Sequence, residues 1–279
     1  MRARLWVVFA VVLVTGCSGS RPADNGLRGV TSVLVARHGK VITERYYGGT
    51  RADDRLPVFS VTKSFTSALV GLAIADGYLS GVGERLPWRR QVKVGQLLSM
   101  TAGYAPSVNF KRADPESLAD RPLLNRPGTF AYDSGSMDLL SDLIARTTGM
   151  SAAGYARRRL FGPLGITDVR WPGSRGSSGL LLRPRDLLAF GQLYLDGGVR
   201  HGKRIVPARW IRLSTRPHAP STSGLRYGYG WWIDRDSFLA LGYLGQVLAI
   251  YPGRDEVVVV TGSREDAKTL ALVHRLARE

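Results

Sequence analysis

The chain has 279 residues, of which 44% are hydrophobic and 9% aromatic, the composition of a folded globular protein rather than of a disordered tail. Its single cysteine excludes an intramolecular disulfide and a cysteine-based zinc site. With 39 Lys and Arg residues against 22 Asp and Glu residues, the formal net charge is +17. The four histidines are scattered without a pair at metal-ligand spacing, so we expect neither a metal nor another cofactor.

The N-terminus has the layout of an export signal. Two arginines precede a short apolar run, Leu5–Val14, which Thr15, Gly16 and Cys17 follow. Ten apolar residues are too few to span a bilayer, which needs about 20 in a helix. This layout is typical of a secretory signal peptide. The segment Val14–Cys17 resembles a bacterial lipobox, in which the cysteine is acylated and becomes the new N-terminus.

We therefore expect a signal peptide over residues 1–16, a lipid-anchored tether over residues 17–28 and a folded domain over residues 29–279. The lipid, a palmitate or similar acyl chain on Cys17, would hold the protein on the extracytoplasmic side of a bacterial cell membrane. An ordinary signal peptide that happens to contain a cysteine is the alternative.

The basic residues are dispersed along the chain. The longest run is Arg157–Arg159, and it is flanked by helix-forming residues. We find no recognition helix, basic tract or array of stacking aromatics, so we expect no nucleic-acid partner. A basic protein tethered to an anionic leaflet would instead be drawn toward the membrane surface.

Strand patterns occur near both ends of the chain and helix patterns between them. Thr31–Arg37 and Val41–Tyr47 flank a Gly-containing turn and predict a hairpin, and the Ala- and Leu-rich stretch Val61–Asp76 predicts a helix that ends at Gly77. Further predicted helices are Val94–Met100, Met137–Thr147, Ala152–Leu160, Arg185–Leu195 and Asp266–Arg278, and further strands are Phe238–Leu241, Gln246–Tyr251 and Glu256–Gly262.

This order predicts an α+β fold. A hairpin alone is marginally stable, so the N-terminal pair should join the three C-terminal strands in a five-stranded antiparallel sheet. We expect the helix Val61–Asp76 and the terminal helix to flank this sheet. The resulting α/β lobe, about residues 29–86 and 200–279, would lie beside an all-helical lobe of about residues 87–199. Ligand sites favour the cleft between two such lobes.

Ser60 and Lys63 form a Ser-x-x-Lys tetrad at the start of a predicted apolar helix. At a spacing of three residues the two side chains share a helix face, and the backbone N–H of Ser60 is an unpaired donor at the helix start. A buried lysine loses the hydration that favours its charged form, which makes its amine a proton acceptor. The alternative is that Ser60 is an N-cap and Lys63 extends to solvent.

A second motif, Tyr132-Asp133-Ser134, follows a Pro-Gly turn and precedes a predicted helix. A phenol needs a nearby cation to act as a base near neutral pH, and Lys63 could supply that charge. The alternative is that Asp133 or Ser134 caps the helix and that Tyr132 is a packed aromatic.

A third motif, Gly242–Gln246, stands at the start of a predicted strand. Two glycines in a strand indicate either a close approach of the backbone to a ligand or a bulge.

In this order the three motifs resemble those of the serine β-lactamase and penicillin-binding protein superfamily. Because the middle motif begins with tyrosine, the resemblance is to the class C-like branch, which includes esterases and 6-aminohexanoate-dimer hydrolases. The similarity runs from about Leu27 to the C-terminus and implies a β-lactamase/transpeptidase-like fold. The segments that carry it are Val58–Leu79, Val94–Tyr104, Arg126–Ile144, Leu160–Ile166, Asp186–Gly198 and Tyr227–Ile233.

The resemblance implies an acyl-enzyme mechanism. Ser60 would be the nucleophile, and Lys63 and Tyr132 would share the task of taking and returning its proton. The backbone N–H groups of Ser60 and Gln246 would form the oxyanion hole. The residues that would contact the substrate are Ser134, Tyr243 and Gly245. A Ser-His-Asp triad is disfavoured because the chain has no Gly-x-Ser-x-Gly elbow and no histidine in a matching segment.

Two positions depart from the family's pattern. Tyr243 stands where β-lactamases and penicillin-binding proteins place a Lys or His that holds the substrate's carboxylate, and Ser134 replaces the usual Asn. The leading hypothesis is therefore a cell-envelope serine hydrolase that cleaves a small-molecule ester, amide or peptide-like substrate. One alternative is a β-lactamase or D,D-peptidase. The other is a catalytically silent envelope protein that keeps the fold for binding.

Overall fold

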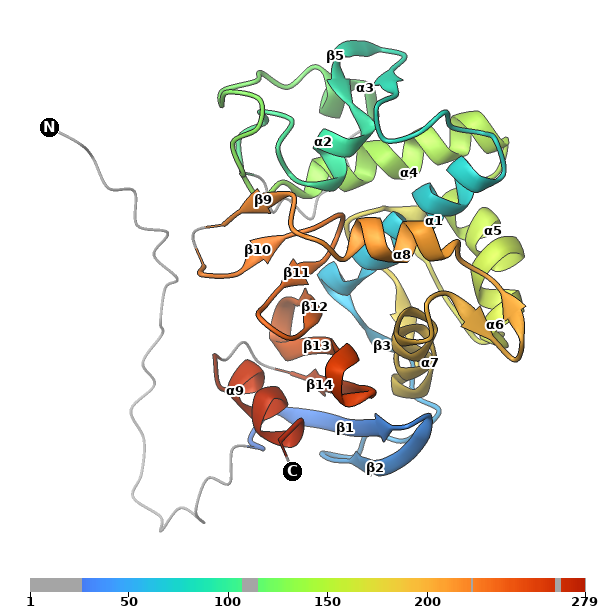
Figure 1. Ribbon diagram of the computed structural model, residues 1–279, viewed down its shortest axis with the longest axis vertical. Coiled ribbons are helices and arrows are strands. Elements are labelled where there is room, and N and C mark those ends of the chain that lie inside the picture. The colour runs from blue at the N-terminus through green and yellow to red at the C-terminus, as the bar shows by residue number, and fades with distance from the viewer. Residues whose placement is uncertain (1–26, 107–114, 222, 264–266, 279) are drawn as a thin grey trace, which may run out of the picture.

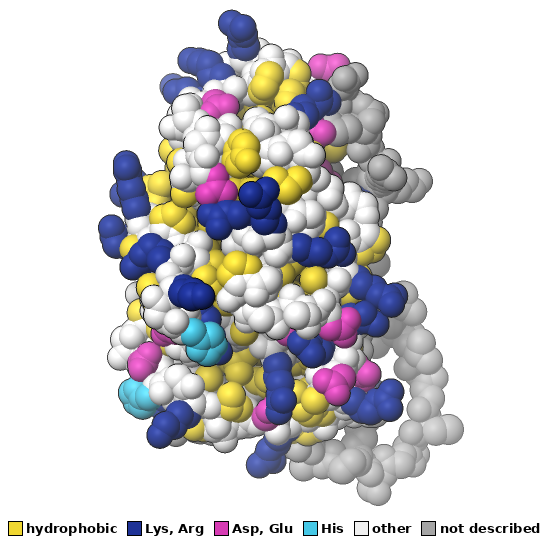
Figure 2. All heavy atoms as spheres, turned by 90° about the vertical axis from the view of Figure 1, so that its right-hand side faces the viewer, with side chains coloured by type: hydrophobic (Ala, Val, Ile, Leu, Met, Phe, Trp, Pro, Cys, Tyr) yellow, Lys and Arg dark blue, Asp and Glu magenta, His cyan; other side chains and the backbone are white. Residues whose placement is uncertain are grey.

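The computed structural model describes residues 27–106, 115–221, 223–263 and 267–278 (Figure 1). The predicted signal peptide, Cys17 and most of the predicted tether lie outside these residues. No helix of the described segments is long and apolar enough to cross a membrane. On the face drawn in Figure 2, Lys and Arg side chains are dispersed among acidic and apolar ones.

The centre of the molecule is one antiparallel sheet, with the strand order β2-β1-β14-β13-β12-β11-β10-β9. Its strands are β1 (Val30–Arg37), β2 (Lys40–Tyr46), β9 (Ala219–Pro220), β10 (Arg226–Tyr227), β11 (Trp232–Ile233), β12 (Phe238–Gly242), β13 (Gln246–Tyr251) and β14 (Glu256–Gly262). Three short two-stranded sheets lie outside it: β3 (Leu56–Pro57) with β6 (Leu181–Leu182), β4 (Arg85–Leu86) with β5 (Arg89–Lys93), and β7 (Val199–Arg200) with β8 (Lys203–Arg204).

The five predicted strands are present and adjacent, but the expected total of five is wrong, because the described sheet has eight strands. β9, β10 and β11 extend it beyond β12, and each contains only two residues. Such short strands in a Gly- and Trp-rich segment have no periodicity that a sequence pattern could reveal.

Helices fill the segments between the strands. They are α1 (Thr62–Ala75), α2 (Val94–Leu98), α3 (Pro115–Ala119), α4 (Ser134–Thr148), α5 (Ala152–Ala156), α6 (Gly162–Leu164), α7 (Pro184–Leu195), α8 (Ala208–Ser214) and α9 (Ala267–Leu276). Among the shorter turns, η1 (Phe59–Val61) precedes α1, the π-helical turn η2 (Arg157–Phe161) follows α5, and η4 (Tyr243–Gly245) joins β12 to β13.

The sheet is buried on both faces, which explains the run of four valines in β14. Val257 and Val259 point into the main core, and Val258 and Val260 point into a second, smaller core that includes Val273 of α9. α7 packs against β13, β14 and β1 on the main-core side, and α9 packs against β13 and β14 on the other side (Figure 1). A strand covered on both faces reads as a continuous apolar run rather than an alternating one.

The predicted helix Val61–Asp76 corresponds to α1, and we expected it to cover the sheet. On the main-core face, however, the helix that packs most closely against the sheet is α7. α1 lies deeper, between α4, α5 and α8, and every residue from Thr62 to Ala73 is buried. A helix buried on all sides lacks a solvent-facing stripe, so its pattern does not indicate which neighbour it packs against.

Asp76, at the C-terminal end of α1, joins this helix to α5 and η2. Arg159 donates two hydrogen bonds of 2.6 Å to its carboxylate, and the Tyr155 hydroxyl donates a third of 2.7 Å. The hydrogen bonds from Arg159 lower the pKa of Asp76 below its ordinary value of 3.8 and outweigh burial, which raises it. Asp76 is therefore ionised and bound at neutral pH.

We expect Asp76→Asn to lower the free energy of unfolding at pH 7 by about 1–2 kcal/mol. Because the folded-state pKa of Asp76 is depressed, its contribution is present above the unfolded pKa near 4 and is lost as the pH falls through the folded pKa. Urea denaturation of both proteins between pH 7 and pH 2 should show this difference shrinking in acid. A difference that stays constant over that range would contradict the assignment.

Candidate active site

Ser60 lies where the start of α1 meets the sheet. It lies in η1, which leads directly into α1 and packs against β12 and β13. A Cβ at Gly242, the last residue of β12, would lie 2.5 Å from the Val58 carbonyl oxygen, so only glycine permits this approach. Phe59, immediately before Ser60, has a positive φ of 46°, a sparsely populated conformation that concentrates at functional sites.

Lys63, the second residue of α1, is only 2% exposed. Its Nζ donates hydrogen bonds to Ser60 Oγ at 2.9 Å and to the Ser177 carbonyl oxygen at 3.0 Å. No carboxylate pairs with it in the part of the chain that the structure describes. The alternative in which Lys63 extends to solvent is therefore wrong, and the Ser60 side chain caps neither η1 nor α1.

Ser177 is a site residue that the sequence analysis missed. Its backbone N–H donates to Asp138 Oδ1 of α4 at 2.9 Å, and its carbonyl oxygen faces Lys63. The neighbouring Gly176 lies so close to α4 that a Cβ would be 1.9 Å from the Met137 carbonyl oxygen. Because every residue carries a backbone carbonyl, no residue type at this position could have indicated the role.

The aromatic ring of Tyr132 contacts the side-chain nitrogen of Lys63. Lys63 Nζ lies 5.0 Å from the ring centroid, within the range of a cation–π contact. On the other side the ring stacks on Trp232, with centroids 5.7 Å apart and planes at 17°. The described contacts include no hydrogen bond from the Tyr132 hydroxyl to Ser60 or Lys63. Catalytic hydrogen bonds are often loose without substrate and tighten when it binds.

Tyr132 belongs to an aromatic cluster formed by Phe130, Tyr132, Tyr227 and Trp232. Tyr227 is buried, and burial raises the pKa of its phenol well above 10, with the neighbouring Tyr132 adding to the effect. Tyr227 is thus neutral at physiological pH. The cluster provides an apolar wall beside Lys63, suited to an uncharged part of a substrate.

Asp133 fixes the start of α4 immediately after Tyr132. Its carboxylate accepts hydrogen bonds from the N–H groups of Gly135 and Ser136, so Asp133 rather than Ser134 is the N-cap. Arg121 binds the same carboxylate through two hydrogen bonds of 2.7 and 2.8 Å. Asp133 is 1% exposed, so the carboxylate of this bidentate ion pair is shielded from water.

We expect Arg121→Ala to lower the free energy of unfolding by about 2–4 kcal/mol, because it leaves the buried carboxylate of Asp133 without its cation. The loss is kept within this range because Arg121 is partly exposed, so that solvent screens the pair. Arg121→Lys keeps the charge but not the two-pronged geometry, so its loss should be smaller. Urea denaturation measures both values. An alanine variant within about 0.5 kcal/mol of wild type would show that the pair does not stabilise this helix start.

The third motif is a turn that leads into a strand, as its predicted place at the start of a strand requires. Residues 243–245 form η4 between β12 and β13, with positive φ at Leu244 (60°) and Gly245 (80°). Tyr243 is 44% exposed, and its ring meets that of Phe59 edge-on, with centroids 5.6 Å apart. Gln246 begins β13, and its side chain donates a 2.7 Å hydrogen bond to the Gly262 carbonyl oxygen. The motif therefore lies beside the Ser60 turn.

The structure thus brings Ser60, Lys63 and Tyr132 into one chain of contacts, with η4 next to Phe59. Ser134 is buried at the first position of α4, next to Tyr132. Among the described residues, no group of three or more His, Cys, Asp or Glu side chains is arranged to hold a metal ion.

The family model described as Beta-lactamase matches residues 19–279. The chain belongs to the beta-lactamase family. It is 26% identical over 286 aligned residues to the 6-aminohexanoate-dimer hydrolase of Paenarthrobacter ureafaciens, covering 85% of this chain and 73% of that protein.

Two solved structures carry the same fold. The penicillin-binding protein from Bacillus halodurans has a TM-score of 0.74 and 16% identity, with 89% of this chain and 97% of that chain covered. EstCE1, a hydrolase with promiscuous acyltransferase activity, has a TM-score of 0.75 and 19% identity, with 91% and 94% covered. The β-lactamase/transpeptidase-like fold is thereby confirmed, and the beta-lactamase-family chain is a serine hydrolase of the amidase and esterase type.

Proposed function

We propose that this serine hydrolase cleaves an ester or a small amide through an acyl-enzyme on Ser60. The observation that carries the proposal is the 2.9 Å contact between Ser60 Oγ and Lys63 Nζ, at a lysine that is buried and lacks a carboxylate partner among the described residues. A serine is a weak nucleophile until an adjacent base takes its proton, and a nucleophile and base within hydrogen-bond reach are the geometric signature of this chemistry.

In acylation, Ser60 Oγ attacks the carbonyl carbon while its proton passes to Lys63 and Tyr132, which share the task of taking it. The backbone N–H groups of Ser60 and Gln246 stabilise the negative charge that develops on the carbonyl oxygen. The tetrahedral intermediate collapses, and the leaving alcohol or amine departs with the proton. Water then attacks the acyl-enzyme, releases the carboxylic acid and regenerates Ser60.

The residues beside the site favour substrates without a carboxylate near the reacting carbonyl. Tyr243 offers no cationic group where β-lactamases and penicillin-binding proteins place a Lys or His, and the aromatic cluster offers an apolar wall. Ser134, Tyr243 and Gly245 are the substrate contacts we propose. The relative from Paenarthrobacter ureafaciens is named for a linear amide dimer, which supports a small amide as one substrate class. A β-lactamase or D,D-peptidase activity is the second candidate, supported by the family rather than by Tyr243.

A panel of substrates tests the proposal and separates the candidates. Wild type and Ser60→Ala are compared on p-nitrophenyl butyrate, a linear amide dimer and nitrocefin. We expect the wild type alone to turn over the ester or the amide, with little hydrolysis of nitrocefin. Rapid nitrocefin turnover with no esterase activity would instead assign the β-lactamase function. Equal rates for wild type and Ser60→Ala would reject the Ser60 mechanism.

We also propose that the enzyme is exported and anchored in the cell membrane by a lipid on Cys17. The support is the lipobox-like segment that ends at Cys17 and the polar stretch that follows it. Cells expressing wild type or Cys17→Ala are fed a radiolabelled palmitate and fractionated. We expect label and membrane association only in the wild type. Label that persists in Cys17→Ala would contradict the anchor.

A further inference from the structure

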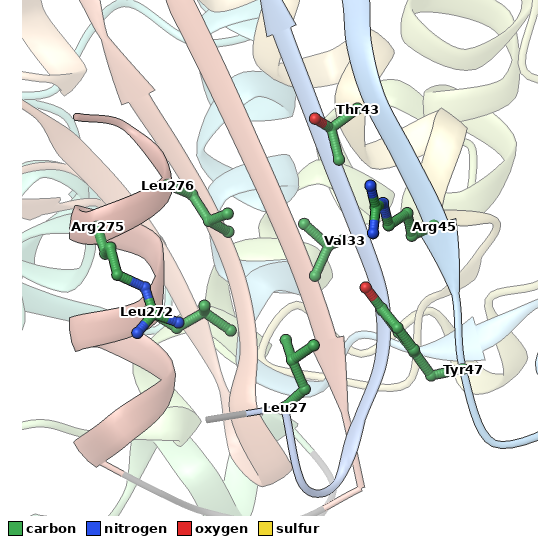
Figure 3. Close-up of a pocket in the computed structure, with 8 residues that line it drawn as sticks. All are labelled: Leu27, Val33, Thr43, Arg45, Tyr47, Leu272, Arg275 and Leu276. Atoms are coloured by element: carbon green, nitrogen blue, oxygen red, sulfur yellow. The ribbon is translucent and has the colours of Figure 1, made fainter. Parts of the chain in front are cut away.

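A groove separates α9 from the β1–β2 hairpin, on the face of the sheet that carries the smaller core (Figure 3). Its volume is about 530 Å³, within the range of roughly 300–1,000 Å³ that small-molecule sites occupy. The side chains of Leu27, Val33, Leu272 and Leu276 point into it, and those of Arg45 and Arg275 flank it (Figure 3). Ser60 lies in the turn between Val58 and Val61, two residues of the main core on the opposite face of the sheet.

The two arginines give the groove a charged rim. Arg45 on β2 and Arg275 on α9 are both exposed, and neither is paired with an acidic side chain among the described residues. A guanidinium presents a rigid fork of donors that matches a phosphate. An apolar floor between two such groups suits an amphiphile with a phosphate headgroup and a hydrocarbon chain.

The position of the groove along the chain indicates which amphiphile would reach it. Leu27 is ten residues after Cys17, and ten extended residues span at most about 36 Å. A lipid on Cys17 would therefore keep Leu27, and the groove that it lines, within about 36 Å of the membrane surface. The intervening segment, residues 18–26, reads SGSRPADNG and has no large apolar side chain to fill the groove itself.

We propose that this groove binds an anionic phospholipid of the membrane. The phosphate lies at the rim, where Arg45 and Arg275 stand on opposite sides of the groove, and an acyl chain lies against Leu27 and Leu276. The orientation of the enzyme on the membrane rests on the proposed anchor at Cys17. The binding of a phospholipid in the groove does not depend on that anchor. Bound in this way, the protein would lie with α9 and the β1–β2 hairpin toward the bilayer and the Ser60 face of the sheet away from it.

The test measures binding without the covalent anchor. Full-length protein carrying Cys17→Ala is cosedimented with vesicles of phosphatidylcholine and phosphatidylglycerol at 3:1, and with pure phosphatidylcholine. We expect binding to the mixed vesicles that weakens at least about tenfold in Arg45→Gln/Arg275→Gln. The charge-matched pair Arg90→Gln/Arg212→Gln, at exposed arginines on β5 and α8, should change the affinity less than about twofold. Leu276→Gln should weaken binding without changing the charge.

Equal losses in the two arginine pairs would overturn the proposal, because binding would then depend on net charge alone. An unchanged affinity in Leu276→Gln would also overturn it, because no acyl chain would occupy the groove. Ester hydrolysis by each variant serves as the control for folding and should be unchanged. Vesicle binding tests the groove, palmitate labelling tests the anchor and ester hydrolysis tests the Ser60 mechanism. A negative result in one of these measurements therefore does not affect the other two proposals.

Discussion

Replacement of Ser60 by alanine is expected to reduce hydrolysis of the best ester or amide substrate by at least about four orders of magnitude. The reason is that no other hydroxyl is hydrogen-bonded to Lys63 among the described residues, so no second nucleophile stands ready. Initial rates of p-nitrophenyl butyrate hydrolysis measure the effect. Because Ser60 makes no capping contact, thermal unfolding of the variant should match wild type.

Ser64→Ala is the matched control for this substitution. Ser64 lies one helical turn from Ser60 on α1, and its hydroxyl donates a 2.6 Å hydrogen bond to the Gly230 carbonyl oxygen rather than to the catalytic group. Its loss should lower the free energy of unfolding by about 1 kcal/mol and leave most of the activity. A Ser60→Ala enzyme as active as Ser64→Ala would remove Ser60 from the mechanism.

Lys63→Met is expected to lower kcat about one hundred- to ten-thousandfold while leaving the fold intact. Methionine fills a similar volume but cannot accept the proton of Ser60. The loss of the hydrogen bond to the Ser177 carbonyl costs about 1–3 kcal/mol, but methionine also avoids the cost of burying a polar amine, which is of about the same size, so the variant should be about as stable as wild type. Substrate kinetics and thermal unfolding together separate the two effects.

Lys63→Arg is the companion variant. It keeps the positive charge, but a guanidinium does not release a proton in proteins, so this variant should be as inactive as Lys63→Met. If Lys63→Arg retained near wild-type kcat, Lys63 would act only as a fixed positive charge. If Lys63→Met retained it, Lys63 would have no part in the chemistry.

The longer apolar elements could be predicted from the sequence. The β1–β2 hairpin, α1 and the last three strands lie within a few residues of their expected limits. Ser60 and Lys63 meet because they are one helical turn apart, and Tyr132 directly precedes Asp133, the N-cap of α4. Local spacing and the family resemblance were sufficient for this part of the site.

The features that escaped prediction depend on tertiary contacts. The strands β9 to β11 have two residues each, and they exist because β12 offers an edge on which they can pair. Arg121 reaches Asp133 across twelve residues, and Ser177 contacts Lys63 through a backbone carbonyl 114 residues away. Neither contact leaves a periodic trace in the sequence. The tight turn within the third motif was not anticipated either, because positive φ is rare for a side chain such as that of Leu244.

The central claim is that Ser60 forms the acyl-enzyme, and covalent labelling tests it most directly. Wild type, Ser60→Ala and Ser64→Ala are incubated with a fluorophosphonate, and the adduct is located by peptide mass spectrometry. We expect one adduct on the peptide containing Ser60 in wild type and in Ser64→Ala, lost together with hydrolytic activity in Ser60→Ala. An adduct on another residue, or full hydrolysis by Ser60→Ala without any adduct, would contradict the account.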